Sequence, residues 1–121
     1  MSGPAARLAI IGSRGRMGRA LTHLIGGEFA SRCSLHASIH SSSAPADWLQ
    51  AFNCDLWIDF SLPAGIRGIA AAFDAARAQG TSTPPPALVI GATGHDAAER
   101  AILQGLSART LVLQASNFSI G

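Results

Sequence analysis

The sequence contains no lysine and no tyrosine, so that all nine of its basic residues are arginines. These absences exclude a lysine Schiff base, a P-loop lysine and a Tyr–Lys dehydrogenase pair within the 121 residues. Cysteine is scarce as well. Cys33 and Cys54 form neither a CxxC pair nor a zinc-ligand spacing, which predicts two reduced cysteines packed as small apolar residues in a cytoplasmic protein, and no metal site.

Charge is also sparse, because only 13% of the residues are charged and the net charge is +2. The arginines are scattered along the chain, and this pattern predicts neither a nucleic-acid nor a membrane partner. No apolar run approaches the length of a membrane span, and no signal-peptide pattern precedes Arg7. We expect residues 1–6 to be a disordered lead-in and residues 7–121 to form a single domain.

Apolar runs alternate with helical patterns along the whole chain. Strands are expected at residues 8–11, 35–39, 56–60, 87–90 and 110–114, and helices at 17–25, 45–52, 63–79 and 95–106. This alternation predicts an α/β fold, a Rossmann-type doubly wound parallel sheet of about five strands in the order 3-2-1-4-5. The first helix is expected to bury one apolar face, made of Met17, Ala20, Leu21, Leu24 and Ile25.

A glycine-rich loop joins the first predicted strand to the first predicted helix. Gly12, Gly15 and Gly18 follow the GxxGxxG spacing. Glycines here permit a tight turn, a close approach of backbone to a diphosphate, and close packing of helix on strand. The unpaired amides and the positive end of the helix favour an anion. Within a βαβ unit, this pattern predicts dinucleotide binding rather than a tight turn without a ligand.

The second predicted strand ends at His40-Ser41 with no carboxylate to accept ribose hydroxyls. Dinucleotide sites that select NAD usually carry an acidic residue at this point. Arg14, His40, Ser41 and Ser42 could instead surround the 2′-phosphate of NADPH. The alternative is that Arg14 and Arg16 are solvated and His40 is a half-exposed strand end, and the sequence leaves both interpretations open.

Other chemically active side chains are better explained by structure than by catalysis. Asp59 is expected to bond the backbone amides of the loop that follows it, and Cys54 and the two tryptophans to pack in the core. His95 is expected to cap a helix rather than to act as an acid. The sequence therefore predicts no catalytic residue.

Four segments resemble the nucleotide-binding half of the dihydrodipicolinate reductase family, the reductases of diaminopimelate and lysine biosynthesis. They are AIIGSRGRMGRAL at residues 9–21, WIDFSLP at 57–63, VIGATG at 89–94 and ASNFSIG at 115–121. The resemblance implies hydride transfer from NADH or NADPH to a cyclic imine-type dicarboxylate. It covers nearly the whole chain, with the segments in the same order.

The resemblance also implies a role for each matching position. The pyrophosphate would be held by Gly12, Gly15, Arg16, Met17 and Gly18. The cofactor would be lined by Phe60, Ser61 and Gly65. The nicotinamide would be flanked by Gly91 and Thr93, with Thr93 near the substrate, and by Asn117 and Phe118 on its far side.

The chain also departs from the family pattern. His40-Ser41 stands where the family often has Glu-Arg, and Leu62 where it frequently has Arg. The family's second domain, which binds substrate through a His-His-Arg-x-Lys helix and donates the proton, has no counterpart in the 121 residues, so we expect this polypeptide alone to be inactive. Family members are oligomers. The alternatives are a shortened, non-catalytic NAD(P)-binding module and the start of an atypical short-chain dehydrogenase, which the lack of tyrosine and lysine disfavours.

Overall fold

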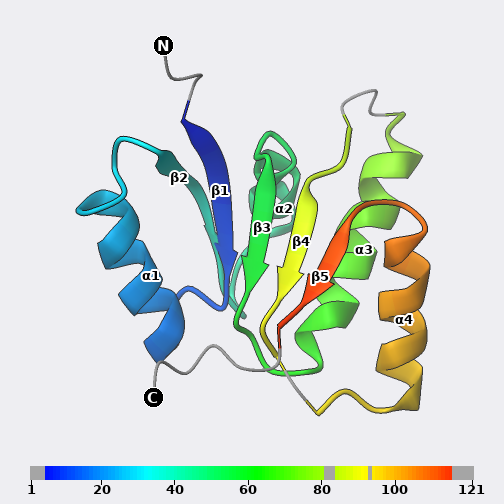
Figure 1. Ribbon diagram of the computed structural model, residues 1–121. Coiled ribbons are helices and arrows are strands. Elements are labelled where there is room, and N and C mark those ends of the chain that lie inside the picture. Colours follow the sequence, from blue (N-terminus) through cyan, green and yellow to red (C-terminus); the bar gives the residue numbers. More distant parts are fainter. Residues whose placement is uncertain (1–4, 81–83, 93, 116–121) are drawn as a thin grey trace.

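A computed structural model describes residues 5–80, 84–92 and 94–115 of the chain. Five strands and four helices alternate through them (Figure 1). In chain order these elements are β1 (Ala6–Ile11), α1 (Arg16–Gly26), β2 (Cys33–Ile39), α2 (Pro45–Ala51), β3 (Leu56–Asp59), α3 (Gly65–Ala78), β4 (Ala87–Ile90), α4 (Ala97–Ser107) and β5 (Val112–Gln114). The predicted elements are confirmed, with ends that shift by a few residues. The expected lead-in was one residue too long, because Ala6 already pairs with Cys33 in the sheet.

The sheet is entirely parallel, but its strand order is β2-β1-β3-β4-β5. The predicted order 3-2-1-4-5 is therefore wrong. After β2 the chain returns past β1 through the seven-residue α2, and β3 then pairs with the free side of β1. The direction of winding consequently reverses between β1 and β3, the position where open parallel sheets bind their ligands.

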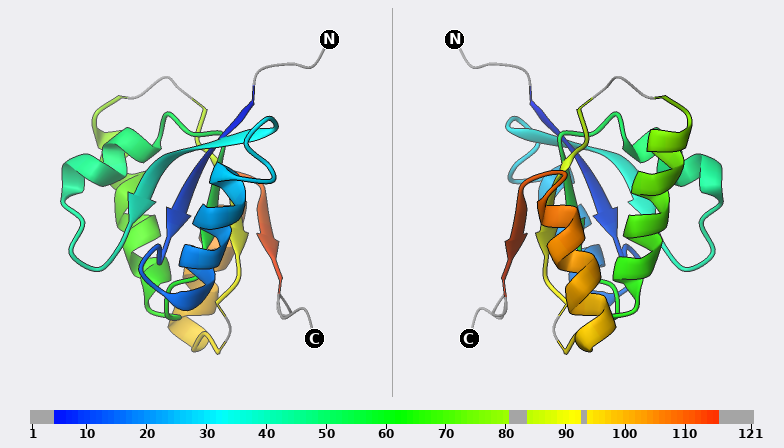
Figure 2. Two further views of the ribbon diagram at one scale, coloured as in Figure 1. Left: turned by 90° about the vertical axis from the view of Figure 1, so that its left-hand side faces the viewer. Right: turned by 90° about the vertical axis from the view of Figure 1, so that its right-hand side faces the viewer.

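Helices cover the two faces of the sheet unequally (Figure 2). The larger core lies under α2, α3 and α4, and Trp57 is fully buried at its centre between Phe52 and Phe73. The indole Nε1 of Trp57 donates to the carbonyl of Ala51 at 2.8 Å, so the one polar atom of this ring has a partner. Cys54 is buried in the same core, and the predicted packing role of Cys54 and Trp57 is thus confirmed.

The opposite face of the sheet carries α1 alone among the described helices, over a smaller core around Leu8, Ile10 and Ile25. The predicted apolar face of α1 is only partly right. Leu21 and Ile25 pack on the sheet, whereas three other members of that face are exposed, namely Met17, Ala20 and Leu24. The helix lies beside β1 and β2, so it contacts the sheet along a narrower stripe than its apolar pattern covers.

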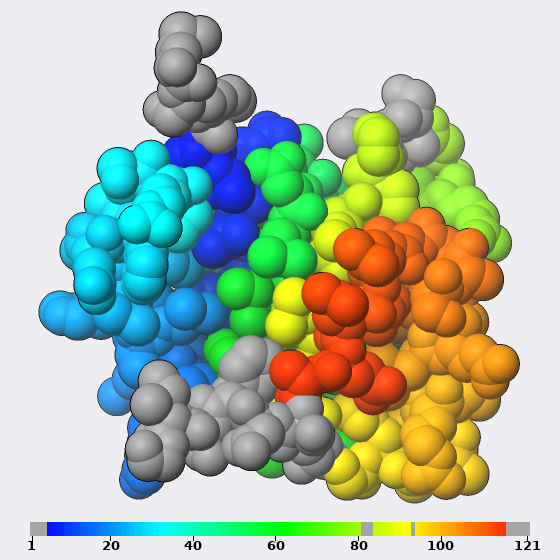
Figure 3. Space-filling view, viewed as in Figure 1, coloured from blue at the N-terminus to red at the C-terminus, as the bar shows by residue number. Residues whose placement is uncertain are grey.

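Strands β3, β4 and β5 reach the surface on this same face (Figure 3). Leu113 in β5 and Leu111 just before it are exposed, at 55% and 64%. Among the described residues, no helix has both the length and the apolar character that crossing a membrane requires.

A prediction concerns the two tryptophans. Trp57→Phe removes the bond to Ala51 and leaves a cavity, so the free energy of unfolding should fall by about 1–3 kcal/mol. Trp48→Phe is the matched control, because Trp48 is only half-buried and packs against the edge of the same cluster. Urea unfolding followed by circular dichroism measures both. Equal losses for the two variants would contradict the central role of Trp57.

Candidate functional site

The loops that follow β1, β3 and β4 meet at the carboxyl edge of the sheet, which is the lower edge in Figure 1. The amide of Phe60 donates to the carbonyl of Ile11 at 2.8 Å, and the amide of Gly91 donates to the carbonyl of Asp59 at 2.8 Å. Each bond continues the sheet ladder one step beyond a strand. The three loops are therefore fixed relative to one another at the point where the winding reverses.

Gly12 ends β1 with a backbone angle φ of +86°, in the left-handed region that favours glycine. A Cβ atom on Gly12 would lie 2.7 Å from the amide nitrogen of Ser61 and 2.8 Å from the carbonyl carbon of Phe60. Both neighbours are backbone atoms, which cannot turn aside as a flexible side chain could. Only glycine lets the loop after β1 lie directly against the loop after β3.

The other two glycines of the loop have different functions. A Cβ atom on Gly18 would lie 2.8 Å from Cα of Ser13, so a glycine here lets α1 pack directly on the loop. Gly15 caps the start of α1, and its amide donates to the carbonyl of Gly12 at 3.1 Å. A Cβ on Gly15 would come only within 3.4 Å of that carbonyl oxygen. The loop therefore needs Gly12 and Gly18 for packing, whereas Gly15 leaves the helix start open.

The amino end of α1 has no side-chain cap and no acidic residue in its first turn. The amino end of α4 is different, because Asp96 accepts from the amide of Glu99 at 2.8 Å and Glu99 accepts from the amide of Asp96 at 2.9 Å. The first turn of an α-helix has amides without intrahelical partners and carries a partial positive charge. In α4, carboxylates of the protein accept hydrogen bonds from these amides. In α1, the amides of the first turn have no such partner and are available to an external anion.

The predicted ribose pocket lies next to this helix end. The carbonyl of Ile39, the last residue of β2, accepts from the amides of Gly12 and Ser13 at 2.8 and 3.2 Å. His40 and Ser41 follow directly, so the structure brings them to the same edge as the exposed Arg14. Nδ1 of His40 already accepts from the amide of Ser42 at 3.1 Å, which leaves Nε2 as the nitrogen that could meet a ligand.

Asp59 fixes the loop after β3, as its sequence position predicted. Its Oδ1 accepts from both the amide and the hydroxyl of Ser61. Burial raises the pKa of Asp59, and the bonds from Ser61 together with the nearby His95 oppose that rise. Gly65 lies so close to Ser61 that a Cβ atom there would overlap the serine side chain. Phe60, Ser61 and Gly65 thus form one compact unit beside Gly12.

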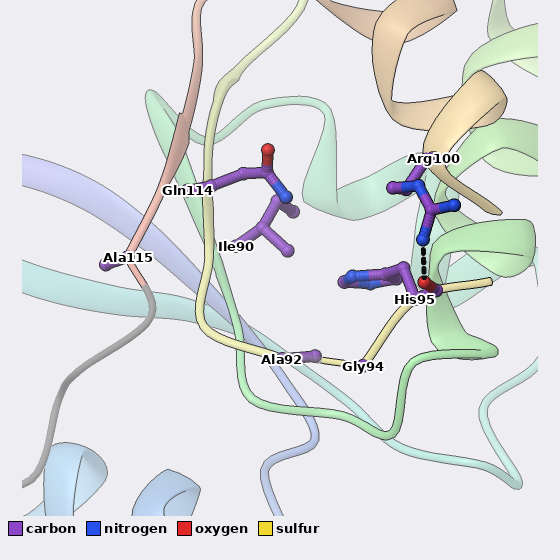
Figure 4. A pocket seen from close by; sticks show the side chains of 7 residues that line it. All are labelled: Ile90, Ala92, Gly94, His95, Arg100, Gln114 and Ala115. Carbon is purple, nitrogen blue, oxygen red and sulfur yellow. Dashed lines mark hydrogen bonds between the residues drawn. The ribbon is translucent and has the colours of Figure 1, made fainter. Parts of the chain in front are cut away.

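At the nicotinamide end, Gly91 lies half-buried where β4 ends. Thr93, Asn117 and Phe118 lie outside the described residues. The structure also shows a pocket of about 340 Å³ that the sequence did not indicate, beside the loop that follows β4 (Figure 4). His95 lines it and does not cap α4, because Asp96 does. Arg100 and Gln114 were missed, since a residue inside a helix and a strand terminus give no motif.

A glycine loop at the winding reversal and an open helix start beside it define a nucleotide-binding domain of Rossmann type. The family described as dihydrodipicolinate reductase, N-terminus, matches residues 6–118, and the chain belongs to this family. The resemblance seen in the sequence is thereby confirmed, and the short-chain dehydrogenase alternative is wrong.

Individual relatives agree with the family assignment. The 4-hydroxy-tetrahydrodipicolinate reductases of Bdellovibrio bacteriovorus and Wolinella succinogenes are each 33% identical over 95% of this chain. The reductase of Afipia carboxidovorans is 29% identical over 95% of it. The matched regions make up 45%, 46% and 46% of these relatives, so the chain spans less than half of their length. Reductases of this family use NADH or NADPH, and their N-terminal domain is the dinucleotide-binding part.

A prediction concerns the glycines of the loop. Gly12→Ala should destabilise the protein by about 1–3 kcal/mol, because it puts a non-glycine residue at positive φ against fixed backbone. Gly15→Ala is the matched control, since its φ of −74° suits any residue and its Cβ meets only ordinary crowding. Thermal unfolding of both variants, with and without NADPH, is the measurement. An unchanged midpoint for Gly12→Ala would disprove the packing role of this glycine.

Proposed function

We propose that the chain is the NAD(P)H-binding domain of a cytoplasmic reductase that transfers hydride to a cyclic imine-type dicarboxylate in diaminopimelate and lysine biosynthesis. The observation that carries the proposal is the uncapped amino end of α1. It follows the Gly12 loop and lies where the direction of winding of the sheet reverses, between β1 and β3. The dinucleotide supplies the hydride when it is bound. In the working protein a second domain would bind the substrate and donate the proton, and the assembly would be an oligomer without nucleic-acid or membrane partners.

The residues around Gly12 fit a diphosphate. Its two negative charges would meet the free amides of the first helical turn and the positive end of the α1 dipole, an interaction worth about 0.3–1 kcal/mol per charge at an exposed site. The exposed guanidinium groups of Arg14 and Arg16 add positive charge beside this end. We assign the pyrophosphate contacts to the loop and the start of α1, that is to Gly12, Gly15, Arg16, Met17 and Gly18.

The remaining contacts follow from the positions of the neighbouring loops. Phe60, Ser61 and Gly65 would line the cofactor between adenosine and nicotinamide, because the backbone of Phe60 and Ser61 lies against Gly12 and Gly65 lies against the side chain of Ser61. Asp59 acts through Ser61 by holding that loop in place. Gly91 and Thr93, with Asn117 and Phe118, would surround the nicotinamide, and Thr93 would also approach the substrate.

We further propose a preference for NADPH over NADH. No acidic residue ends β2, and Arg14, His40 and Ser41 lie at one edge where a 2′-phosphate would project. A charge-assisted hydrogen bond contributes about 1.5–3 kcal/mol, which corresponds to roughly a tenfold to hundredfold difference in affinity. Salt and exposure will reduce the value, because Arg14 is a surface residue.

Calorimetric titration with both dinucleotides tests this preference. Arg14→Ala should weaken NADPH binding by about tenfold and leave NADH binding nearly unchanged. Arg77→Ala, an exposed arginine near the far end of α3, is the matched control and should change neither. Equal losses of both dinucleotides in Arg14→Ala would show that Arg14 contacts the shared pyrophosphate. Tighter binding of NADH by the unmodified chain would refute the NADPH preference.

A second prediction concerns turnover. A polypeptide of these 121 residues should bind NADPH without reducing substrate at a measurable rate. The proton donor and substrate-binding residues that the family resemblance implies have no counterpart among these residues, and general acid help is typically worth about 10²–10⁴ in rate. The oxidation of NADPH, followed by its absorbance in the presence of the cyclic dicarboxylate, measures this. Rates comparable to those of a full-length reductase assayed in parallel would show that the described domain carries its own catalytic groups.

A further inference from the structure

Two buried polar atoms lack hydrogen-bond partners, one at the end of β3 and one in the loop after β4. Asp59 is 1% exposed and His95 is 9% exposed. Within the described part of the chain, Oδ2 of Asp59 and Nε2 of His95 are both cut off from solvent, and neither makes a hydrogen bond. Buried side-chain oxygen and nitrogen atoms nearly always have a partner in folded proteins, so both atoms call for an explanation.

The fold brings these two residues close together. Asp59 pairs with Ile90 across β3 and β4, and the amide of Gly91 donates to the carbonyl of Asp59 at 2.8 Å. The loop then turns at Gly94, whose φ is +83°, and His95 borders the same pocket as Ile90 (Figure 4). Burial raises the pKa of Asp59, while the bonds from Ser61 and the nearby His95 lower it, so the two side chains interact electrostatically.

The two unpartnered atoms are chemically complementary. A carboxylate oxygen accepts hydrogen bonds, and Nε2 of an imidazole donates one when it carries hydrogen. The side chain of Asp59 is held in place, because its Oδ1 accepts from the amide and the hydroxyl of Ser61. The imidazole is free to turn about its side-chain bonds, since Arg100 holds His95 only by its backbone carbonyl, at 2.7 Å.

The charged groups at the start of α4 have other partners. Asp96 and Glu99 each accept from the backbone amide of the other, at 2.8 and 2.9 Å. The two carboxylates also lie 4.0 and 3.8 Å from the guanidinium nitrogens of Arg67. Among the described residues, His95 is the one titratable side chain whose charge acts on Asp59.

We infer that Nε2 of His95 donates a hydrogen bond to Oδ2 of Asp59, and that this buried pair fastens the loop after β4 to the loop after β3. Asp59 then holds residues 91–95 at both ends, because its carbonyl binds the amide of Gly91 and its carboxylate binds His95. The other carboxylate oxygen holds Ser61. One buried side chain thus fixes both loops relative to each other.

The consequence for cofactor binding rests on the proposed function, in which these two loops line the dinucleotide. Asp59 and His95 are positioning residues there, since they act through Ser61 and Gly91. The hydrogen bond itself is a property of the protein without ligand. It can therefore be tested independently of any dinucleotide.

Long-range ¹H–¹⁵N correlation spectra of the imidazole rings test the pair, because they show which ring nitrogen carries hydrogen. In mildly alkaline solution His95 should carry hydrogen on Nε2, and its signal is assigned by its loss in His95→Phe. His40 is the internal reference for this tautomer, since its Nδ1 accepts from the amide of Ser42 at 3.1 Å. A His95 ring without hydrogen on Nε2 would overturn the inference.

Asp59→Asn gives a sharper test, because it keeps the shape of the side chain and replaces an acceptor by a donor. The amide of Ser61 keeps the asparagine oxygen on its own side, so the new NH₂ group faces His95. The hydrogen of His95 should then move from Nε2 to Nδ1, whereas His40 should not change. An unchanged His95 ring in this variant would contradict the pair. If the variant does not fold, the spectrum of the unmodified chain decides.

Hydrogen exchange measures whether the pair holds the loop. In His95→Phe the amide of Gly91 should exchange about tenfold faster, because a hydrogen bond to a charged group is lost. The amide of Gly12, which donates to the carbonyl of Ile39 at 2.8 Å, is the control within the same sample. His36→Phe, at an exposed histidine of β2, is the matched control variant. Unaltered exchange at Gly91 in His95→Phe would refute the loop-fastening role.

Calorimetric titration of NADPH into the same two variants separates the pair from the proposed function. His95→Phe should bind NADPH several-fold more weakly, and His36→Phe should bind it as the unmodified chain does. Equal affinity in all three proteins would show that the pair does not position the cofactor loops. Failure of the unmodified chain to bind NADPH would count against the proposed function alone, because the ring spectra and the exchange rates need no ligand.

Discussion

The contact between Gly12 and the backbone of Phe60 and Ser61 determines the shape of the carboxyl edge of the sheet. A side chain at position 12 would separate the two loops, since its Cβ would fall within 2.8 Å of two backbone atoms. Because β1 and β3 are neighbours, this contact closes the bottom of the crevice at which the winding reverses. The direction of α1, which starts four residues after Gly12, follows from it, and so does the position of the loop that Asp59 holds.

Two helices of the same length, α1 and α4, illustrate how capping decides function. Both are eleven residues long and both begin at the carboxyl edge of the sheet. The start of α4 is satisfied by Asp96 and Glu99, so an anion gains little there from the backbone. The start of α1 has glycine at the equivalent position and no acid in its first turn, which leaves its positive end for a ligand. The fold supplies several helix starts, and the side chains determine which one is available.

The periodicity of the sequence was sufficient to predict the elements and to place the glycine loop and Asp59 at the carboxyl ends of strands, because strand ends, glycine spacing and the position of Asp59 are local properties. Strand order was not predictable in the same way. The order depends on whether β3 pairs with β2 or with the free side of β1. The short α2 that joins β2 to β3 carries no sequence pattern that distinguishes these two arrangements. The exposure of Met17 and Leu24 was also missed, because an apolar stripe does not specify how much of it the sheet will cover. The pocket at His95 and Arg100 arises from residues on separate elements, and only their packing brings it into existence.

The buried carboxyl group of Asp59 makes the stability of the loop after β3 depend on pH. Its pKa in the folded protein is raised, chiefly by burial, so the folded state binds this proton more tightly than the unfolded chain does. The resulting stabilisation is complete below the pKa of an unfolded aspartate and is lost as the pH rises through the raised value. In its ionised form the buried carboxylate lowers the stability of the folded state, and two bonds from Ser61 and the attraction of His95 offset part of that cost. The bonds that anchor the loop after β3 favour the ionised carboxylate, whereas burial favours the protonated one, so loop anchoring and fold stability favour opposite protonation states of Asp59.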